Sequence, residues 1–105
     1  MPNSFVTNLY PKPTPDTTME KIVLDSSSTP EGKTTTYSNL TKYIVLDVQD
    51  ADARVRFDGT VVSQSTGHRL YAGRSYTLSK AALEAASFIR SGSTTSNIYL
   101  TEFTD

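Results

Sequence analysis

The sequence has no cysteine and no tryptophan, and its single histidine is His68. Without cysteine the chain cannot form disulfide bonds, use a thiol in catalysis or bind zinc through thiolates. One imidazole cannot supply a metal site of two histidines, and a Ser-His-Asp triad would depend on His68 alone. The lack of tryptophan, which stacks on sugar rings, also argues against the active site of a glycoside hydrolase. We therefore expect no catalytic residue, no metal and no cofactor.

The sequence also lacks long apolar runs and clusters of one charge. No apolar run approaches the length of a membrane span, and the start, MPNSFVTNLYPKP, lacks the basic-then-apolar order of a secretory signal. The net charge is −1, the pI is near 5.7, and lysine and arginine are scattered without a five-residue basic cluster. Binding through phosphate neutralisation is therefore poorly supported. We expect a soluble protein, not exported by that route, whose partner is neither a nucleic acid nor a membrane.

The chain of 105 residues suits one compact domain, and its first twenty residues differ from the rest. Proline fixes φ and donates no backbone hydrogen bond, so the prolines of this segment exclude a regular helix and favour an extended arm. These prolines are Pro2, Pro11, Pro13 and Pro15. The arm also carries the apolar residues Phe5, Val6, Leu9, Tyr10 and Met19. We predict an extended arm over residues 1–20 and one β-domain over residues 21–105, with the arm docked on a neighbouring subunit or on its own domain.

Short stretches with period-two alternation run through the predicted β-domain. The stretch YIVLDV, residues 43–48, is rich in β-branched residues and suits a buried strand. Further on, Ala53, Val55 and Phe57 alternate with charged residues, so one face of this strand meets a core and the other is polar. Ser79 precedes KAALEAA and can cap a helix of two turns at most. The pattern predicts an all-β fold, a small antiparallel β-sandwich or barrel with one short helix and the extended N-terminal arm.

Glycines mark the expected turns. Asp58-Gly59 lies between the strand that carries Phe57 and the stretch Thr60-Val61-Val62. Such a pair is the strongest short-range signal for a tight type I′ hairpin, in which both central residues have positive φ. Gly73 marks a second turn, after the stretch HRLYA. The glycines are too far apart to cradle a phosphate group.

Carboxylates cluster in the middle of the chain, and oxygen ligands of this kind suit calcium. They are Asp47, Asp50, Asp52 and Asp58. The spacing does not fit a calcium-binding EF-hand loop, because Ala53 and Arg54 stand where further ligands and a glycine belong. A solvated turn between two strands explains Asp50 and Asp52.

The C-terminal half has a recognisable order of segments. From Val55 to Phe103 it runs VRFDG, STGHRLYAG, SYTLS, a short helix with FIRSGST, and a closing NIYLTEF. This order resembles small β-proteins that are common among the virion genes of tailed bacteriophages, where similar proteins serve as capsid decoration or cement proteins or as other small head and tail components. The resemblance implies a non-enzymatic structural protein on the capsid surface of the virion, assembled in the host cytoplasm, and it assigns no catalytic residue.

The leading hypothesis is a decoration protein that binds and stabilises the assembled head, with the major capsid protein and further copies of itself, as a dimer or trimer, as partners. The alternatives are a neck or tail adaptor, a fibre component, or a carbohydrate-binding module for host attachment through Tyr71 and His68. Arg54 and Arg56 share a strand face and can pair with carboxylates of a partner. The candidate contact residues are Phe5, Val6, Leu9 and Tyr10 in the arm and Arg54, Arg56, His68 and Tyr71 in the domain.

Overall fold

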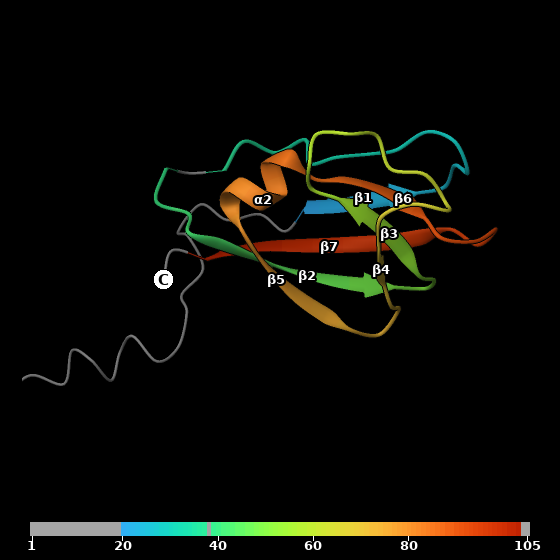
Figure 1. Cartoon of the computed structure of the whole chain (residues 1–105). Coiled ribbons are helices and arrows are strands. Elements are labelled where there is room, and N and C mark those ends of the chain that lie inside the picture. Colours follow the sequence, from blue (N-terminus) through green and yellow to red (C-terminus); the bar gives the residue numbers. More distant parts are fainter. Residues whose placement is uncertain (1–19, 38, 104–105) are drawn as a thin grey trace, which may run out of the picture.

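The computed structural model describes residues 20–37 and 39–103, which form two antiparallel β-sheets and one short helix (Figure 1). Sheet A has the strand order β1-β7-β2-β5, and sheet B has the order β4-β3-β6. The elements are β1 (Glu20–Leu24), β2 (Tyr43–Gln49), β3 (Ala53–Arg56), β4 (His68–Leu70), β5 (Ser75–Ser79), α2 (Lys80–Ala85), β6 (Ser87–Arg90) and β7 (Ser96–Phe103). The predicted all-β class with one short helix is confirmed. None of the helical residues described form a segment long and apolar enough to cross a membrane.

Strand β7 organises sheet A, because it pairs with β1 on one side and with β2 on the other. Its alternation turns Ile98 and Leu100 to the core, and both are fully buried. Their partners in β2, Val48 and Leu46, are also fully buried. The alternating sequence thus fixes the register, since a slip of one residue would turn these side chains to the opposite face.

The inner faces of the two sheets share one hydrophobic core. Sheet B contributes Val55, Leu70 and Phe88, which join the buried side chains of β2 and β7. Phe88 is fully buried and is the largest side chain at that depth. Tyr76 and Leu78 of β5 share a face and pack, partly buried, against the same core. The strand faces predicted from the alternation are therefore those that meet.

Helix α2 begins at the predicted cap. The Ser79 hydroxyl accepts a hydrogen bond from the Ala82 N–H at 3.1 Å, and Leu83 anchors the helix in the core.

We expect Ser79→Ala to lower the free energy of unfolding by about 1 kcal/mol, because the Ala82 amide loses its acceptor. Urea unfolding monitored by circular dichroism measures this difference. Ser27→Ala, at an exposed serine, is the control, and an equal effect of both changes would contradict the role of the cap.

One predicted element is wrong: the chain does not return from β3 through a tight hairpin at Asp58-Gly59. Strand β3 does pair antiparallel with β4, but the connection runs over residues 57–67. Gly59 has a φ of 78°, whereas Asp58 has no positive φ, and a type I′ turn needs both. The Asp58 carboxylate instead pairs with Arg56. Residues 60–62 form no strand.

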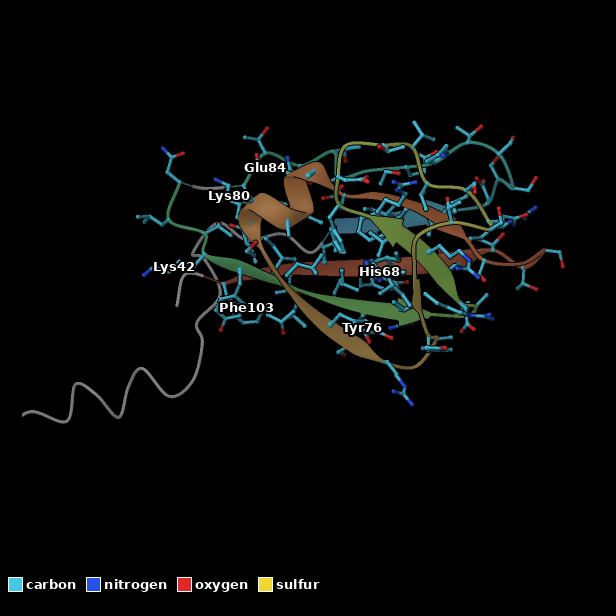
Figure 2. All side chains as sticks on the ribbon, in the orientation of Figure 1. Lys42, His68, Tyr76, Lys80, Glu84 and Phe103 are labelled. Carbon is cyan, nitrogen blue, oxygen red and sulfur yellow. The ribbon has the colours of Figure 1, made fainter. Side chains whose placement is uncertain are left out.

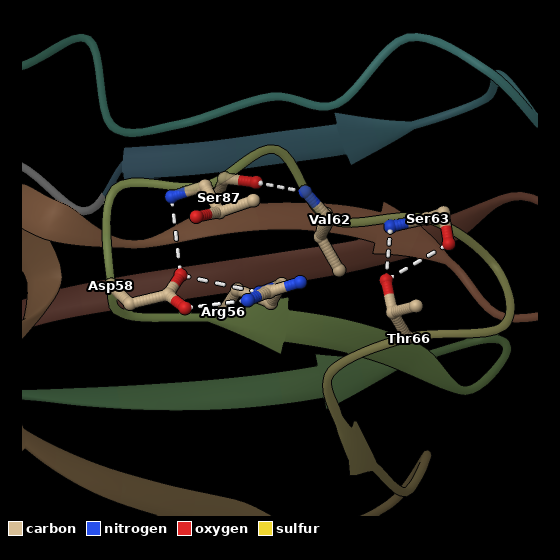
Figure 3. Close-up of polar contacts among 7 residues, drawn as sticks. Arg56, Asp58, Val62, Ser63, Thr66 and Ser87 are labelled. Carbon is tan, nitrogen blue, oxygen red and sulfur yellow. Dashed lines mark hydrogen bonds and ion pairs between the residues drawn. The ribbon is translucent and has the colours of Figure 1, made fainter.

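Burial of Val62 explains why this connection leaves the sheet. Val62 and Ile89 are each 1% exposed, although neither belongs to the main core. The Val62 N–H donates to the Ser87 hydroxyl at 3.1 Å, as Figure 3 shows, and the Gln64 side-chain amide donates to the Arg90 carbonyl at 3.2 Å. These hydrogen bonds thus hold the connection against β6. Burying a valine contributes about 1.5–3 kcal/mol, which a tight hairpin with Val62 on an edge strand would forgo.

The other two predicted turns are confirmed. Gly73 has a φ of 84° between β4 and β5, and its N–H donates to the Val48 carbonyl at 2.7 Å. Asp50 and Asp52 lie in the bend between β2 and β3. Asp50 has a φ of 76°, and its carboxylate accepts a hydrogen bond from the Asn97 side-chain amide. The Asp50 carboxylate thus connects this bend to β7.

Glu20 fastens the polar connection between β1 and β2. The predicted arm over residues 1–20 lies outside the described residues except for Glu20, which begins β1. Its buried carboxylate accepts hydrogen bonds from the Thr34 N–H at 2.6 Å, from the Thr34 hydroxyl at 2.8 Å and from the Tyr37 hydroxyl at 2.9 Å. Tyr37 is buried as well. The connection between β1 and β2 is thus tied to the edge of sheet A.

Candidate interaction surface

The turn between β4 and β5 presents an exposed aromatic side chain. Tyr71 is 48% exposed, and the guanidinium groups of Arg69 and Arg74 lie over its ring, 5.6 Å and 5.7 Å from the ring centroid. Cation–π contacts at exposed sites contribute about 0.5–1 kcal/mol each. We call Tyr71, Arg69 and Arg74 the aromatic knob. The two arginines place positive charge beside an apolar ring at the surface.

Backbone hydrogen bonds hold the turn that carries the knob. The Tyr71 N–H donates to the hydroxyl of Tyr76, the β5 residue labelled in Figure 2, at 2.9 Å. The Arg74 N–H donates to the Tyr71 carbonyl at 3.3 Å, and the Ala72 N–H donates to the Asp52 carboxylate at 2.8 Å. These bonds tie the backbone of the turn to β5 and to the residue that precedes β3.

Asp52 links the start of β3 to the knob. One carboxylate oxygen accepts hydrogen bonds from Arg69 Nε at 3.2 Å and Nη2 at 2.9 Å, and the other accepts from the Ala72 N–H. The hydrogen bond from Ala72 and then the contact with Arg69 lower the pKa of Asp52 below its ordinary value. Both oxygens of this carboxylate are therefore engaged within the chain.

A separate hollow of about 560 Å³ lies where β3 meets β4, and it is lined by Arg56, Phe57, Asp58, Gly67 and His68. The Arg56 guanidinium donates to Asp58 from Nε at 3.2 Å and from Nη2 at 2.5 Å, as Figure 3 shows. The Arg56 hydrogen bond is the main cause that lowers the pKa of Asp58 to about 2, and the same pair raises the pKa of Arg56. The His68 ring, labelled in Figure 2, is tilted against Phe57 with 6.2 Å between centroids. The ion pair with Asp58 therefore neutralises the charge of Arg56 within the chain.

Arg54 is in a different position from Arg56, although the two share a strand face. It lies directly opposite Arg69 in the β3–β4 register. Its Nη1 donates to the Gly67 carbonyl at 3.1 Å, and its Nε is buried without an acceptor. Within residues 20–37 and 39–103, no ion pair joins Arg54 to a carboxylate.

The structure divides the sequence-predicted contact residues of the domain into two groups, with Arg54 and Tyr71 near Arg69 and with Arg56 and His68 elsewhere. Tyr71 belongs to the knob, Arg56 and His68 line the hollow, and Arg54 lies opposite Arg69. The predicted arm contacts Phe5, Val6, Leu9 and Tyr10 lie outside the described residues. Sequence reasoning missed Arg69 and Arg74 as partners of Tyr71. The stretch RLYAGR held the signal, since arginines flank the tyrosine on both sides of a turn.

Comparison with known proteins finds no family model, no curated protein and no solved structure that matches this chain.

Proposed function

We propose that this protein is a structural protein of a tailed-phage particle that binds the assembled capsid and stabilises it. The observation that supports this proposal most directly is the aromatic knob. Tyrosine and arginine are enriched among the residues that carry most of the binding energy in protein interfaces. A tyrosine already held by its surroundings loses little conformational freedom when it binds.

The order of segments from Val55 to Phe103 supports the particle as the setting, because it resembles small virion proteins. A capsid presents many copies of one site, so an interface centred on one small turn suffices when several linked copies bind together. A protein that binds the assembled shell and not its dissociated subunits shifts the equilibrium toward the shell by mass action. This mechanism requires no reaction centre.

The experiment measures binding of the purified protein to mature capsids that lack it, by co-sedimentation. We expect saturable binding and capsids that withstand a higher temperature. Tyr71→Ala is expected to weaken binding by about 30-fold, which corresponds to about 2 kcal/mol at an interface hot spot. Since Tyr71 is half exposed, its removal leaves the core of the folded domain intact.

Val61→Ala is the matched control, because Val61 is an exposed apolar residue, 67% accessible, in the connection between β3 and β4. It is expected to bind capsids like the wild type. The proposal is contradicted if the wild-type protein fails to bind, if capsid heat resistance is unchanged, or if both variants bind equally well. A low copy number per virion would assign the protein to the neck or tail instead, and a glycan-array signal abolished by Tyr71→Ala would assign it to carbohydrate binding.

A further inference from the structure

Beside the aromatic knob lies a polar hollow that the knob does not explain. It measures about 300 Å³ and is lined by Ala51, Asp52, Arg54, Arg69, Ser91, Gly92, Ser93 and Thr94. Arg69 belongs to both features, since it lines the hollow and its guanidinium lies over the Tyr71 ring. The hollow and the knob therefore form one continuous surface.

The hollow has more positive than negative charge in its lining. Arg54 and Arg69 stand directly opposite each other on neighbouring strands, an arrangement that is unfavourable for like charges. Asp52 is the carboxylate among the lining residues, and its two oxygens already accept hydrogen bonds from Arg69 and Ala72. Arg54 uses one N–H on the Gly67 carbonyl and keeps a buried Nε without an acceptor. A guanidinium group has five N–H donors, so Arg54 lacks acceptors.

The loop over residues 91–94 completes the hollow with further donors. Its carbonyl groups face partners elsewhere: Gly92 accepts from the Gln64 side-chain amide at 2.6 Å, and Ser93 accepts from Arg90 Nη1 at 3.2 Å. The hydroxyl-bearing residues Ser91, Ser93 and Thr94 line the hollow. In the part of the chain that the structure describes, the N–H groups of residues 92–94 donate no hydrogen bond. The segment that lines the hollow therefore carries hydroxyl groups and N–H groups without an acceptor in the chain.

We infer that this hollow receives a carboxylate from an acidic side chain of the capsid protein while the knob contacts the surface beside it. The inference rests on the proposed function, because it names what the capsid contributes. Arginine and carboxylate groups form paired, charge-assisted hydrogen bonds. Such a carboxylate would accept from Nη2 of Arg54, which has no acceptor among the described residues, and would offset the repulsion between Arg54 and Arg69. Arg56 offers the contrast, since Asp58 already fills this role for it.

The first experiment tests the hollow in the isolated protein. An acetylated, amidated triglutamate peptide is titrated into the labelled protein and followed by NMR. We expect saturable shifts of the backbone amides of residues 92–94 with the triglutamate peptide, and none with the triglutamine peptide. Arg54→Gln is expected to weaken this binding by about ten-fold, as loss of a paired, charge-assisted contact predicts, and Arg54→Lys by less. Arg56→Gln, in the same strand, is expected to change nothing.

Equal shifts with both peptides, no saturation, or equal losses in the Arg54 and Arg56 variants would overturn the inference. Inorganic phosphate is titrated in parallel. If phosphate saturates the shifts of the same amides at a concentration about ten-fold lower than the peptide does, the choice of a carboxylate is overturned. Urea unfolding of each variant ensures that the folded proteins are compared.

The second experiment separates this inference from the proposed function. Capsid binding is measured for the wild type, Arg54→Gln and Arg56→Gln. We expect Arg54→Gln to weaken binding about ten-fold and Arg56→Gln to leave it unchanged. Equal binding by wild type and Arg54→Gln contradicts the inference and leaves the proposed function standing. A wild type that does not bind capsids contradicts the proposed function, and the peptide titration then decides whether the hollow takes a carboxylate.

Discussion

Gly67→Ala is expected to lower the free energy of unfolding by about 2–5 kcal/mol, from a left-handed backbone penalty and from overpacking together. Gly67 has a φ of 97°, which side-chain-bearing residues rarely adopt. An added Cβ would lie 2.7 Å from the Val55 carbonyl oxygen and 3.0 Å from Cγ2 of Val62. The carbonyl belongs to strand β3 and cannot move without disturbing the sheet.

Gly59→Ala is the matched control for this change. Gly59 also has a positive φ, 78°, but no atom lies within 4 Å of an added Cβ. It therefore carries the backbone penalty without the clash, and we expect a loss of about 1 kcal/mol. Urea unfolding at neutral pH measures both variants. Equal losses would show that close approach to Val55 is not what makes Gly67 necessary.

Glu20→Ala is expected to destabilise the protein by about 3 kcal/mol, because it removes an ionised acceptor and leaves the Tyr37 hydroxyl buried without a partner. Thr34 would lose two hydrogen bonds as well. Glu20→Gln keeps an oxygen for Thr34 and lets Tyr37 accept a hydrogen bond instead, so its expected cost at neutral pH is about 1 kcal/mol. Unfolding of Glu20→Ala and Glu20→Gln is compared at neutral pH, and an equal cost would contradict the role of these hydrogen bonds.

The Glu20 cluster also predicts a dependence on acid. Burial acts to raise the pKa of Glu20, but the hydrogen bonds from Thr34 and Tyr37 outweigh it, so the pKa lies below its ordinary value of 4.5. The stabilisation by the ionised form is therefore complete above pH 4.5 and is lost as the pH falls through the lower value of the folded protein. We expect the difference between wild type and Glu20→Gln to vanish in acid. A difference independent of pH would contradict this assignment.

The strands were predictable because each depends on its own alternation of apolar and polar residues. Ile98 and Leu100 face the core for the reason visible in the sequence, and Ser79 caps the helix that follows it. The turn at Asp58-Gly59 was not predictable from local rules. The path of the chain there depends on the burial of Val62 beside β6. Because that strand lies more than twenty residues further along the chain, the contact leaves no pattern in the local sequence.

The candidate site was only partly predictable, because the roles of its residues also depend on contacts between segments that are distant in the sequence. Tyr71 was among the predicted contact residues, but the roles of Arg54 and Arg56 looked alike in the sequence. They differ because Asp58 folds back onto Arg56, whereas the register places Arg54 opposite Arg69. The Glu20 and Tyr37 pair was missed because it joins a strand to a loop across residues that have no periodicity.

The turn that carries Tyr71 is also the crossing of the chain from sheet B to sheet A. Its backbone is tied to β2 through the Val48 carbonyl and to the start of β3 through Asp52. A mechanical load applied at this point by a bound partner would therefore be divided between both sheets. Because β4 and β5 are edge strands of their sheets, such a load would act first on these two strands and on the hydrogen bonds that hold the turn between them.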